Sequence, residues 1–305
     1  MRPFFVVLVL VCCSIACCSM AAAQTIELAG PAIGMMPQTV DRVRVAGTAI
    51  ESLAVWSTGA LHAARADLSG GPIDERSLEI ESAYVNTFEV ATDGRDYLVA
   101  YSTCPDSSGS GCEIRFATIS PDGFVFHSRQ RIAGASVESL AWTGDAYVLA
   151  FRPADRAPFP SKLAILDRRG FVFAEQSSFG GANGYYVDLA ADGSGGVVLA
   201  WATPFGSYFE IATLDDIRRG TIQRVPLANT WAPFTVAVSA SGYVINGWNG
   251  FDNAQTVLLS RSDIVTSSTT SQVAHDEYRV GATSTTRFAV FTEPSPGQYD
   301  LGLRM

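Results

Sequence analysis

The chain has 305 residues, of which 48% are hydrophobic and only 17% charged, so it can bury a large core and does not have the composition of a disordered protein. Its formal net charge of −9 disfavours nucleic acid and anionic membrane surfaces as partners, because both select clustered Lys and Arg. The 27 glycines and the 10% share of aromatic residues favour strands and turns, and no amphipathic helix is expected.

Residues 1–23 have the pattern of a signal peptide. Arg2 precedes an apolar run from Phe4 to Cys18, and the small residues Ala21 to Ala23 follow it. The run has about 15 residues, fewer than the roughly 20 that a membrane-spanning helix needs. We therefore expect export to the periplasm or the extracellular space, with residues 24–305 forming a single domain.

A lipid anchor is the alternative to a freely exported chain. The segment from Ser14 to Cys17 partly resembles the bacterial lipobox, although Ser stands where the motif usually has Leu. An N-terminus at Gln24 would indicate an unanchored protein, and an acylated Cys17 would indicate an anchored one.

The chain is organised as a repeat. Residues 90–101, VATDGRDYLVAY, combine an apolar start, an Asp-Gly turn and an apolar run that ends in an aromatic residue, and five other segments have the same form. The terminal aromatics are Trp56, Tyr101, Phe151, Trp201, Trp248 and Phe291. Their spacing of about 43 to 50 residues is typical of repeat architectures. We expect these side chains to pack in the core between repeats.

Each repeat is expected to contain four strands. In the second repeat the strands are predicted at residues 88–92, 97–102, 113–119 and 130–133. Gly and Asp recur at the turns, where the backbone needs positive φ. Such repeats favour an all-β fold, a six-bladed β-propeller with four antiparallel strands per blade, over a linear array or a sandwich. The orphan segment QTIELAG, residues 24–30, is similar to the fourth strands and is expected to close the last blade.

The repeats resemble exported bacterial propeller-repeat proteins, in which an apolar strand, an Asp-Gly turn, a tyrosine, an apolar run and a tryptophan follow one another. The resemblance covers residues 43–305 and implies a fold rather than a function, since propellers carry unrelated activities. The Trp-Asp and Gly-His signatures of WD40 repeats, the double glycine of kelch repeats and the sialidase Asp box are all missing from the sequence.

Cys104 and Cys112 are the only cysteines outside the leader and bracket a short loop between two predicted strands. In an exported chain such a pair is expected to form a disulfide. The spacing does not favour a reactive redox pair.

The candidate binding residues are aromatics in two sets of loops. In a propeller, the loops from the fourth strand to the next blade and from the second strand to the third share one face. These loops bring the ligand-binding candidates Tyr84, Tyr185, Tyr186, Trp231, Tyr278, Phe205 and Tyr208. Exposed aromatics there would stack on sugars or contact a protein partner. The alternative is that they pack under their own loops.

Polar residues recur near the start of each inner strand: Arg44, Glu89, Ser139, Asp188, Thr235 and Arg279, with Glu138 beside the third. We expect them to ring the entrance of the central channel. Glu89, Asp188 and Glu138 are the catalytic candidates, because two carboxylates that face each other can cleave a glycosidic bond. The alternative is that these charges pair with one another or with water.

No cofactor and no metal are expected. His62, His127 and His275 lie in different repeats without a second ligand nearby, and the sequence contains neither a nucleophile elbow nor a phosphate-binding loop. The sequence therefore favours a non-enzymatic module that binds a protein or a glycan. A carbohydrate-active hydrolase or lyase and a purely structural envelope protein are the alternatives.

Overall fold

The protein is all-β apart from one short helix in the part of the chain that the structure describes. The computed structural model describes residues 42–105, 111–153, 161–176, 185–203, 206–222, 225–227, 231–239, 242–248, 253–260, 265–272, 278–282, 287–295 and 298–304. These residues form separate antiparallel sheets: four of four strands, one of five and one of three.

The first three sheets take the chain from residue 42 to residue 176. Sheet 1 contains β1 (Arg42–Gly47), β2 (Glu51–Thr58), β3 (Ala60–Asp67) and β4 (Leu78–Glu81). Sheet 2 contains β5 (Val85–Thr92), β6 (Tyr97–Thr103), β7 (Glu113–Ile119), β8 (Val125–His127) and β9 (Ile132–Ala133). Sheet 3 contains β10 (Ala135–Trp142), β11 (Tyr147–Pro153), β12 (Lys162–Leu166) and β13 (Val172–Gln176).

The remaining sheets follow in chain order. Sheet 4 contains β14 (Tyr185–Ala191), β15 (Gly196–Thr203), β16 (Gly206–Thr213) and β17 (Val225–Leu227), with α1 (Leu214–Arg219) after its third strand. Sheet 5 contains β18 (Trp231–Ser239), β19 (Gly242–Trp248), β20 (Asn253–Ser260) and β21 (Val265–Gln272). Sheet 6 contains β22 (Tyr278–Ala282), β23 (Arg287–Ser295) and β24 (Gln298–Arg304).

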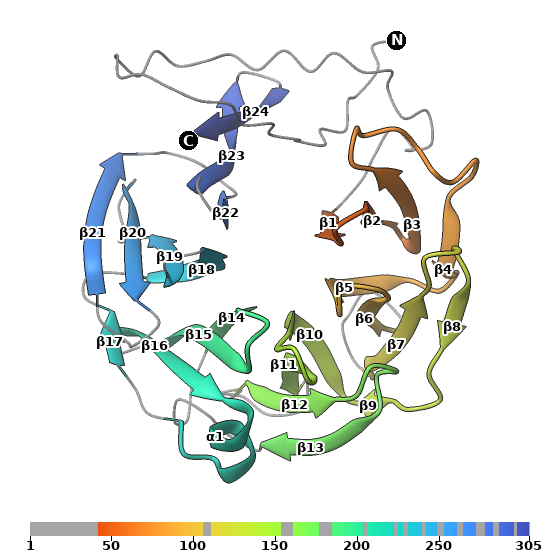
Figure 1. The fold of residues 1–305 in the computed structure, drawn as a ribbon, viewed down its shortest axis with the longest axis horizontal. Helices are drawn as coiled ribbons and strands as arrows, with labels where there is room; N and C mark the ends of the chain where they lie inside the picture. Colours follow the sequence, from red (N-terminus) through yellow and green to blue (C-terminus); the bar gives the residue numbers. More distant parts are fainter. Residues whose placement is uncertain are drawn as a thin grey trace.

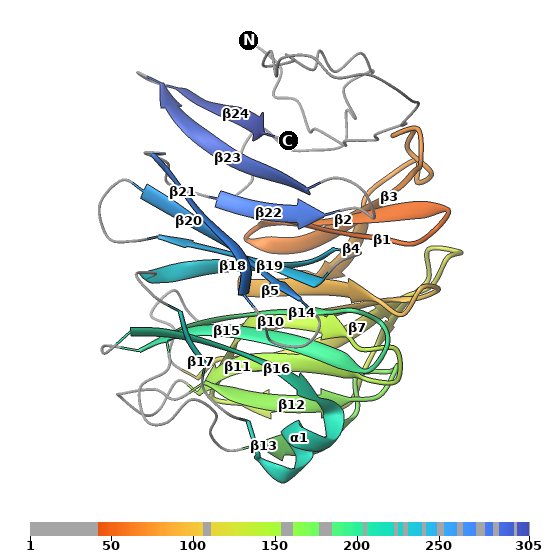
Figure 2. The same ribbon diagram turned by 60° about the vertical axis from the view of Figure 1, so that its left-hand side comes forward.

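The sheets are arranged radially around a common centre (Figure 1). The first strand of each sheet, β1, β5, β10, β14, β18 or β22, lies nearest the centre, and the later strands lie progressively outwards. The view in Figure 2 shows the strands of each sheet one outside the other and strongly twisted. This radial arrangement of antiparallel sheets is that of a β-propeller.

The core lies between neighbouring sheets, as the repeat predicts. Apolar side chains of sheets 1 and 2, of sheets 2 and 3, of sheets 3 and 4, and of sheets 4 and 5 form successive clusters. The repeated aromatics Trp56, Tyr101, Phe151 and Trp201 are all buried. The prediction that they fill the core is therefore confirmed at these four positions; the side chains of Trp248 and Phe291 lie outside the described residues.

Tyrosines at the start of the second strand join neighbouring sheets. The Tyr97 hydroxyl donates a hydrogen bond to the backbone oxygen of Glu51, 3.2 Å away in sheet 1. The Tyr243 hydroxyl donates to Asp192 Oδ2 of sheet 4 at 3.1 Å. Burial raises the pKa of Tyr97 to about 12, so its hydroxyl keeps its proton at neutral pH. Tyr97 and Tyr243 therefore each link their own sheet to the preceding one.

Sheet 2 differs from its prediction in the fourth strand, which is divided in two. β8 pairs with one end of β7 and β9 with the other. Between them, the Gln130 side chain accepts a hydrogen bond from Val172 N–H at 2.7 Å and donates one to the Val172 carbonyl at 3.4 Å. Gln130, between β8 and β9, therefore bonds the first residue of β13 in the next sheet instead of continuing the fourth strand.

α1 has no counterpart among the elements expected from the sequence. Thr213 accepts a hydrogen bond from Asp216 N–H, Asp216 accepts one from Thr213 N–H, and Gly220 ends the helix with φ 66°. This capping box holds a helix of only six residues, too short to show amphipathic periodicity.

Candidate functional site

The polar residues predicted to ring the channel lie within the inner strands rather than before them. Arg44 of β1 donates a hydrogen bond from Nε to Glu89 Oε1 of β5 at 2.7 Å. Both side chains are largely buried. Glu89 therefore forms an ion pair between sheets 1 and 2.

Asp188 of β14 is held between sheets 3 and 5. Its Oδ1 accepts a hydrogen bond from the Ser139 hydroxyl of β10 at 2.7 Å, and its Oδ2 accepts one from Val236 N–H of β18 at 2.9 Å. The Ser139 oxygen in turn accepts a hydrogen bond from Leu189 N–H at 3.1 Å. The inner strands are edge strands, so some of their N–H groups lack a strand partner, and these side chains supply one.

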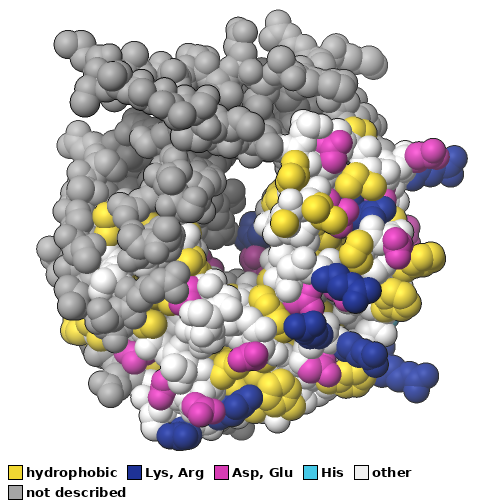
Figure 3. Space-filling view, in the orientation of Figure 1, with side chains coloured by type: hydrophobic (Ala, Val, Ile, Leu, Met, Phe, Trp, Pro, Cys, Tyr) yellow, Lys and Arg dark blue, Asp and Glu magenta, His cyan; other side chains and the backbone are white. Residues whose placement is uncertain are grey.

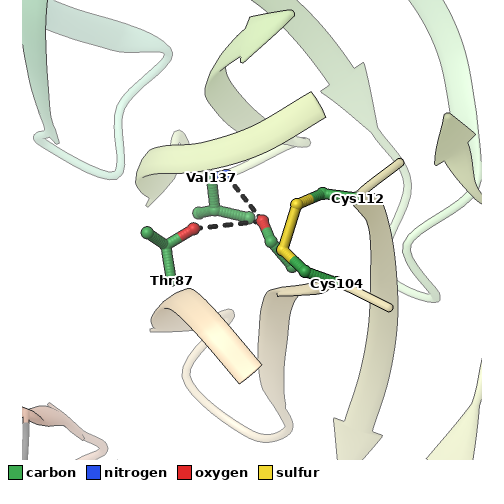
Figure 4. The surroundings of a disulfide bond; sticks show 5 residues. Thr87, Cys104, Cys112 and Val137 are labelled. Carbon is green, nitrogen blue, oxygen red and sulfur yellow. Dashed lines mark hydrogen bonds between the residues drawn. A yellow bond between two sulfur atoms is a disulfide. The ribbon is translucent and has the colours of Figure 1, made fainter. Parts of the chain in front are cut away.

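The same arrangement joins sheets 2 and 3 beside the disulfide (Figure 4). Ser102 Oγ accepts hydrogen bonds from Val137 N–H at 2.9 Å and from the Thr87 hydroxyl at 3.0 Å. The predicted disulfide is present between Cys104 and Cys112, and both cysteines are buried. Polar side chains of the first strands, together with Ser102 of the second strand β6, thus connect successive sheets from sheet 1 to sheet 5.

Tyr84, the binding candidate in the connection from β4 to β5, lies at one end of the sheets. We call the end formed by residues 81–85, 103–105, 111–115 and 128–135, with residues 152–153 and 161, the upper face. The disulfide lies there and is tied to both adjacent connections: Cys104 N–H donates to the Tyr84 carbonyl at 3.4 Å, and Gly134 N–H donates to the Cys112 carbonyl at 2.7 Å. Tyr84 is 47% exposed.

Charged side chains on the upper face are paired in a network. Arg115 contacts Glu81 at 2.7 Å and Glu113 at 2.6 Å, and Arg131 contacts Glu113 at 2.5 Å. Burial raises the pKa of Glu81, but the Ala83 N–H and Arg115 lower it by more, so the net direction is down. On the face that Figure 3 presents, acidic and basic side chains of the described residues are also interspersed.

Glu138 has different surroundings from Glu89 and Asp188. It is the extra residue of a bulge in β10, because Val137 pairs with Phe151 while Ser139 pairs with Ala150. Its side chain is 5% exposed, and Arg152 Nη2 lies 2.9 Å from Oε1. Burial raises the pKa of Glu138, although Arg152 and Ser161 act against the shift.

The other aromatic candidates are distributed as follows. Tyr208 lies within β16 rather than in a loop and stacks on Trp201, with ring centroids 6.0 Å apart. Tyr185 and Tyr186 belong to β14, and Trp231 and Tyr278 begin β18 and β22. The side chains of these four residues, and the whole of Phe205, lie outside the described residues.

The described histidines do not gather into a site. His62 stacks on Trp56, and His127 Nδ1 lies 3.4 Å from the Tyr101 hydroxyl. Within the described ranges, no three His, Cys, Asp or Glu side chains are placed to hold a metal ion together. No helix in the same ranges is long and apolar enough to cross a membrane.

Sequence comparison identifies no relative of this chain: no protein-family model matches it, and neither does any curated protein. Structure comparison does find similar folds. A subtype N10 neuraminidase-like protein of A/little yellow-shouldered bat/Guatemala/060/2010 is 8% identical with a TM-score of 0.56, and the match covers 87% of this chain and 93% of that one.

Two further similar structures have different activities. The SapL1 lectin, solved in complex with alpha methyl fucoside, is 10% identical with a TM-score of 0.52, and the match covers 85% of this chain and 94% of the lectin. A glucose dehydrogenase is 12% identical with a TM-score of 0.51, and the match covers 86% and 95% of the two chains. The chain therefore has a β-propeller fold, and at these identities the likeness concerns the fold alone.

Proposed function

We propose that this chain is an exported β-propeller protein without catalytic activity that binds a glycan through its upper face. The observation that supports binding over catalysis is the bonding of the inner-strand carboxylates. Glu89 is engaged by Arg44, and both oxygens of Asp188 accept hydrogen bonds from other sheets. A glycosidase needs one carboxyl group as acid and another as base or nucleophile, whereas these two join sheets.

The upper face has the chemistry of a surface for neutral, hydroxyl-rich molecules. Its charges are paired across the Glu81, Arg115, Glu113 and Arg131 network, so neither sign dominates. The exposed Tyr84 ring offers an apolar surface against which a sugar can stack. The disulfide fixes the hairpin next to it, which reduces the entropy lost on binding. The similarity to a lectin fold is consistent with this function.

A glycan array probed with the full mature chain tests the proposal. We expect selective binding that weakens when Tyr84 is changed to Ala. The matched control is Phe126→Ala, which removes an aromatic side chain that is 60% exposed, against 47% for Tyr84, from the outer strand β8. Equal loss in both variants, or no binding to any glycan, would contradict the proposal.

Hydrolysis of the bound glycans is the measurement that addresses the non-enzymatic part. Turnover by the wild-type chain that disappears in folded Glu89→Gln or Asp188→Asn variants would overturn it. The absence of turnover with retained binding is the expected result.

We further propose that residues 1–23 are a signal peptide, that residues 24–305 form one domain, and that this domain is a six-bladed ring. Residues 24–30, which lie outside the described residues, would supply a fourth strand to sheet 6. Support comes from the strand numbers, since sheet 6 has three strands among the described residues while sheets 1, 3, 4 and 5 have four. The buried disulfide is consistent with export. Mass spectrometry of the mature N-terminus distinguishes cleavage before Gln24 from acylation at Cys17.

A further inference from the structure

Glu138 and Arg152 form a pair at the junction of sheets 3 and 4, close to the upper face. Glu138 lies on the bulge of β10, and Arg152 lies near the end of β11. The Glu138 side chain is 5% exposed, whereas that of Arg152 is 36% exposed. Arg152 is therefore the accessible member of the pair, and the carboxylate lies behind it.

The pair has more hydrogen-bonding capacity than the described residues use. Neither Oε1 nor Oε2 of Glu138 accepts a hydrogen bond of good geometry there, and Arg152 Nε donates none. Arg152 Nη2 lies 2.9 Å from Oε1 and Ser161 also acts on the carboxyl group, but buried polar atoms whose hydrogen-bonding capacity is not filled are destabilising. Burial raises the pKa of Glu138 despite Arg152, which agrees with an incompletely compensated carboxyl group. Added donors and acceptors at this position would therefore be stabilising.

The surroundings of the pair combine apolar and polar groups. Ala150 lies two residues before Arg152, and Leu163 lies two residues after Ser161. Both belong to the buried cluster that also contains Trp201 of sheet 4. Ser161 is buried, and its side chain lowers the pKa of the Glu138 carboxyl group by hydrogen bonding. Such a mixture suits a ligand with both an apolar face and hydroxyl groups.

We propose that the Glu138–Arg152 pair is a binding site for a neutral sugar unit, an inference that rests on the proposed glycan-binding function. A hydroxyl group both donates and accepts, so adjacent hydroxyls can donate to the Glu138 oxygens and accept from Arg152 Nε. An anion would be repelled by the carboxylate and a cation by the guanidinium. The ligand meets Arg152 first, and movement of that side chain opens the carboxylate to it.

Titration calorimetry with neutral methyl glycosides of fucose, mannose and galactose tests the site, with N-acetylneuraminic acid as an anionic comparison. We expect Glu138→Gln and Arg152→Gln to weaken binding of the best neutral glycoside at least about tenfold, since each removes charge-assisted hydrogen bonds. The matched controls Glu75→Gln and Arg95→Gln remove exposed charges from turns at the end of the sheets opposite the upper face, and should change affinity less than about twofold.

The outcomes separate the site from the function. Glycoside binding that survives in folded Glu138→Gln and Arg152→Gln overturns the site but not the glycan-binding function. Failure of the wild-type chain to bind any glycan overturns both. If the Glu138 variant does not fold, phenylglyoxal modification of the wild-type chain decides: the glycoside should protect Arg152 but not Arg95, which is 81% exposed in the β5–β6 turn at the opposite end. Equal modification rates of Arg152 with and without glycoside would overturn the site.

Discussion

Three carboxylates on the inner strands illustrate how partners decide the role of a residue. Glu89 is bonded by a guanidinium group, Asp188 by a hydroxyl and a backbone N–H, and Glu138 contacts Arg152 on a bulge. The partners of Glu89 and Asp188 belong to other sheets. The three residues have similar sequence contexts. Only the packing of the sheets distinguishes a carboxylate that joins two sheets from one that can still accept hydrogen bonds.

The raised pKa of Glu138 predicts a specific pH dependence of stability. The folded protein keeps the Glu138 proton at pH values at which the unfolded chain has already released it. The stability that this proton contributes is therefore fully present below the pKa of Glu138 in the unfolded chain, and it is lost as the pH rises through the pKa of Glu138 in the folded protein. When unfolding free energies are measured with urea between about pH 4 and about pH 8, the wild-type value should include this decrease with rising pH, and the value of Glu138→Gln should not.

The control for that measurement is Glu175→Gln, which changes an exposed carboxyl group on β13. It should follow the wild-type pH profile. A Glu138→Gln profile that parallels the wild type would show that burial does not shift the Glu138 pKa as described.

Turns at the end of the sheets opposite the upper face also connect neighbouring sheets. Gly195 N–H donates to the Thr143 carbonyl at 2.7 Å, joining sheets 4 and 3. A Cβ at Gly144 would collide with the backbone oxygen of Gly193 in the same contact. Gly144 has φ 106°, so it serves both the turn and the approach of the two sheets.

Comparison of two glycine variants separates these roles. Gly59 has φ 94° but open space around its Cβ position, so Gly59→Ala should incur only the backbone cost, about 1–2 kcal/mol. Gly144→Ala should cost about 1–3 kcal/mol more, because the two turns must move apart. Equal unfolding free energies of the two variants in urea would contradict the close contact.

The disulfide hairpin is expected to stabilise the upper face locally. The Cys104→Ser, Cys112→Ser double variant should lose roughly 2–3 kcal/mol of unfolding free energy on the chain-entropy estimate for so short a loop. Amide exchange at Gly134, which donates to the Cys112 carbonyl, should accelerate more than exchange at Gly123, whose N–H donates to the Ser120 carbonyl at the opposite end. Equal acceleration at both amides would indicate a global rather than a local effect.

At the level of elements, the sequence predicted what every repeat needs. The strands starting at Tyr97 and Glu113, the Asp93-Gly94 turn and the disulfide were predictable, because local turn chemistry and alternation determine them. The division of the fourth strand near Gln130 was not, since it depends on a contact with Val172 in the next sheet. The same holds for the bulge at Glu138, because register is set by the partner strand.

For the whole molecule, closure of the ring by residues 24–30 is the central prediction. Deleting these residues from the mature chain would leave an open edge on sheet 6 and should lower the melting temperature and the cooperativity of unfolding. A chain beginning at residue 31 is compared with one beginning at Gln24 by calorimetry. Identical melting profiles would show that these residues do not pair with the last sheet.

The hydrogen bonds that inner-strand N–H groups donate to side chains of neighbouring sheets have a direction along the chain. Ser102 accepts from Val137 N–H, Ser139 from Leu189 N–H and Asp188 from Val236 N–H, so in each case the accepting side chain precedes the strand that it bonds. During synthesis from the N-terminus, each new inner strand therefore meets a partner that already exists. If one sheet were duplicated, or exchanged between such proteins, its side chains would have to supply the hydrogen-bond acceptor for the inner strand of the sheet that follows. Two neighbouring sheets, rather than a single repeat, are therefore the unit that can be inherited intact.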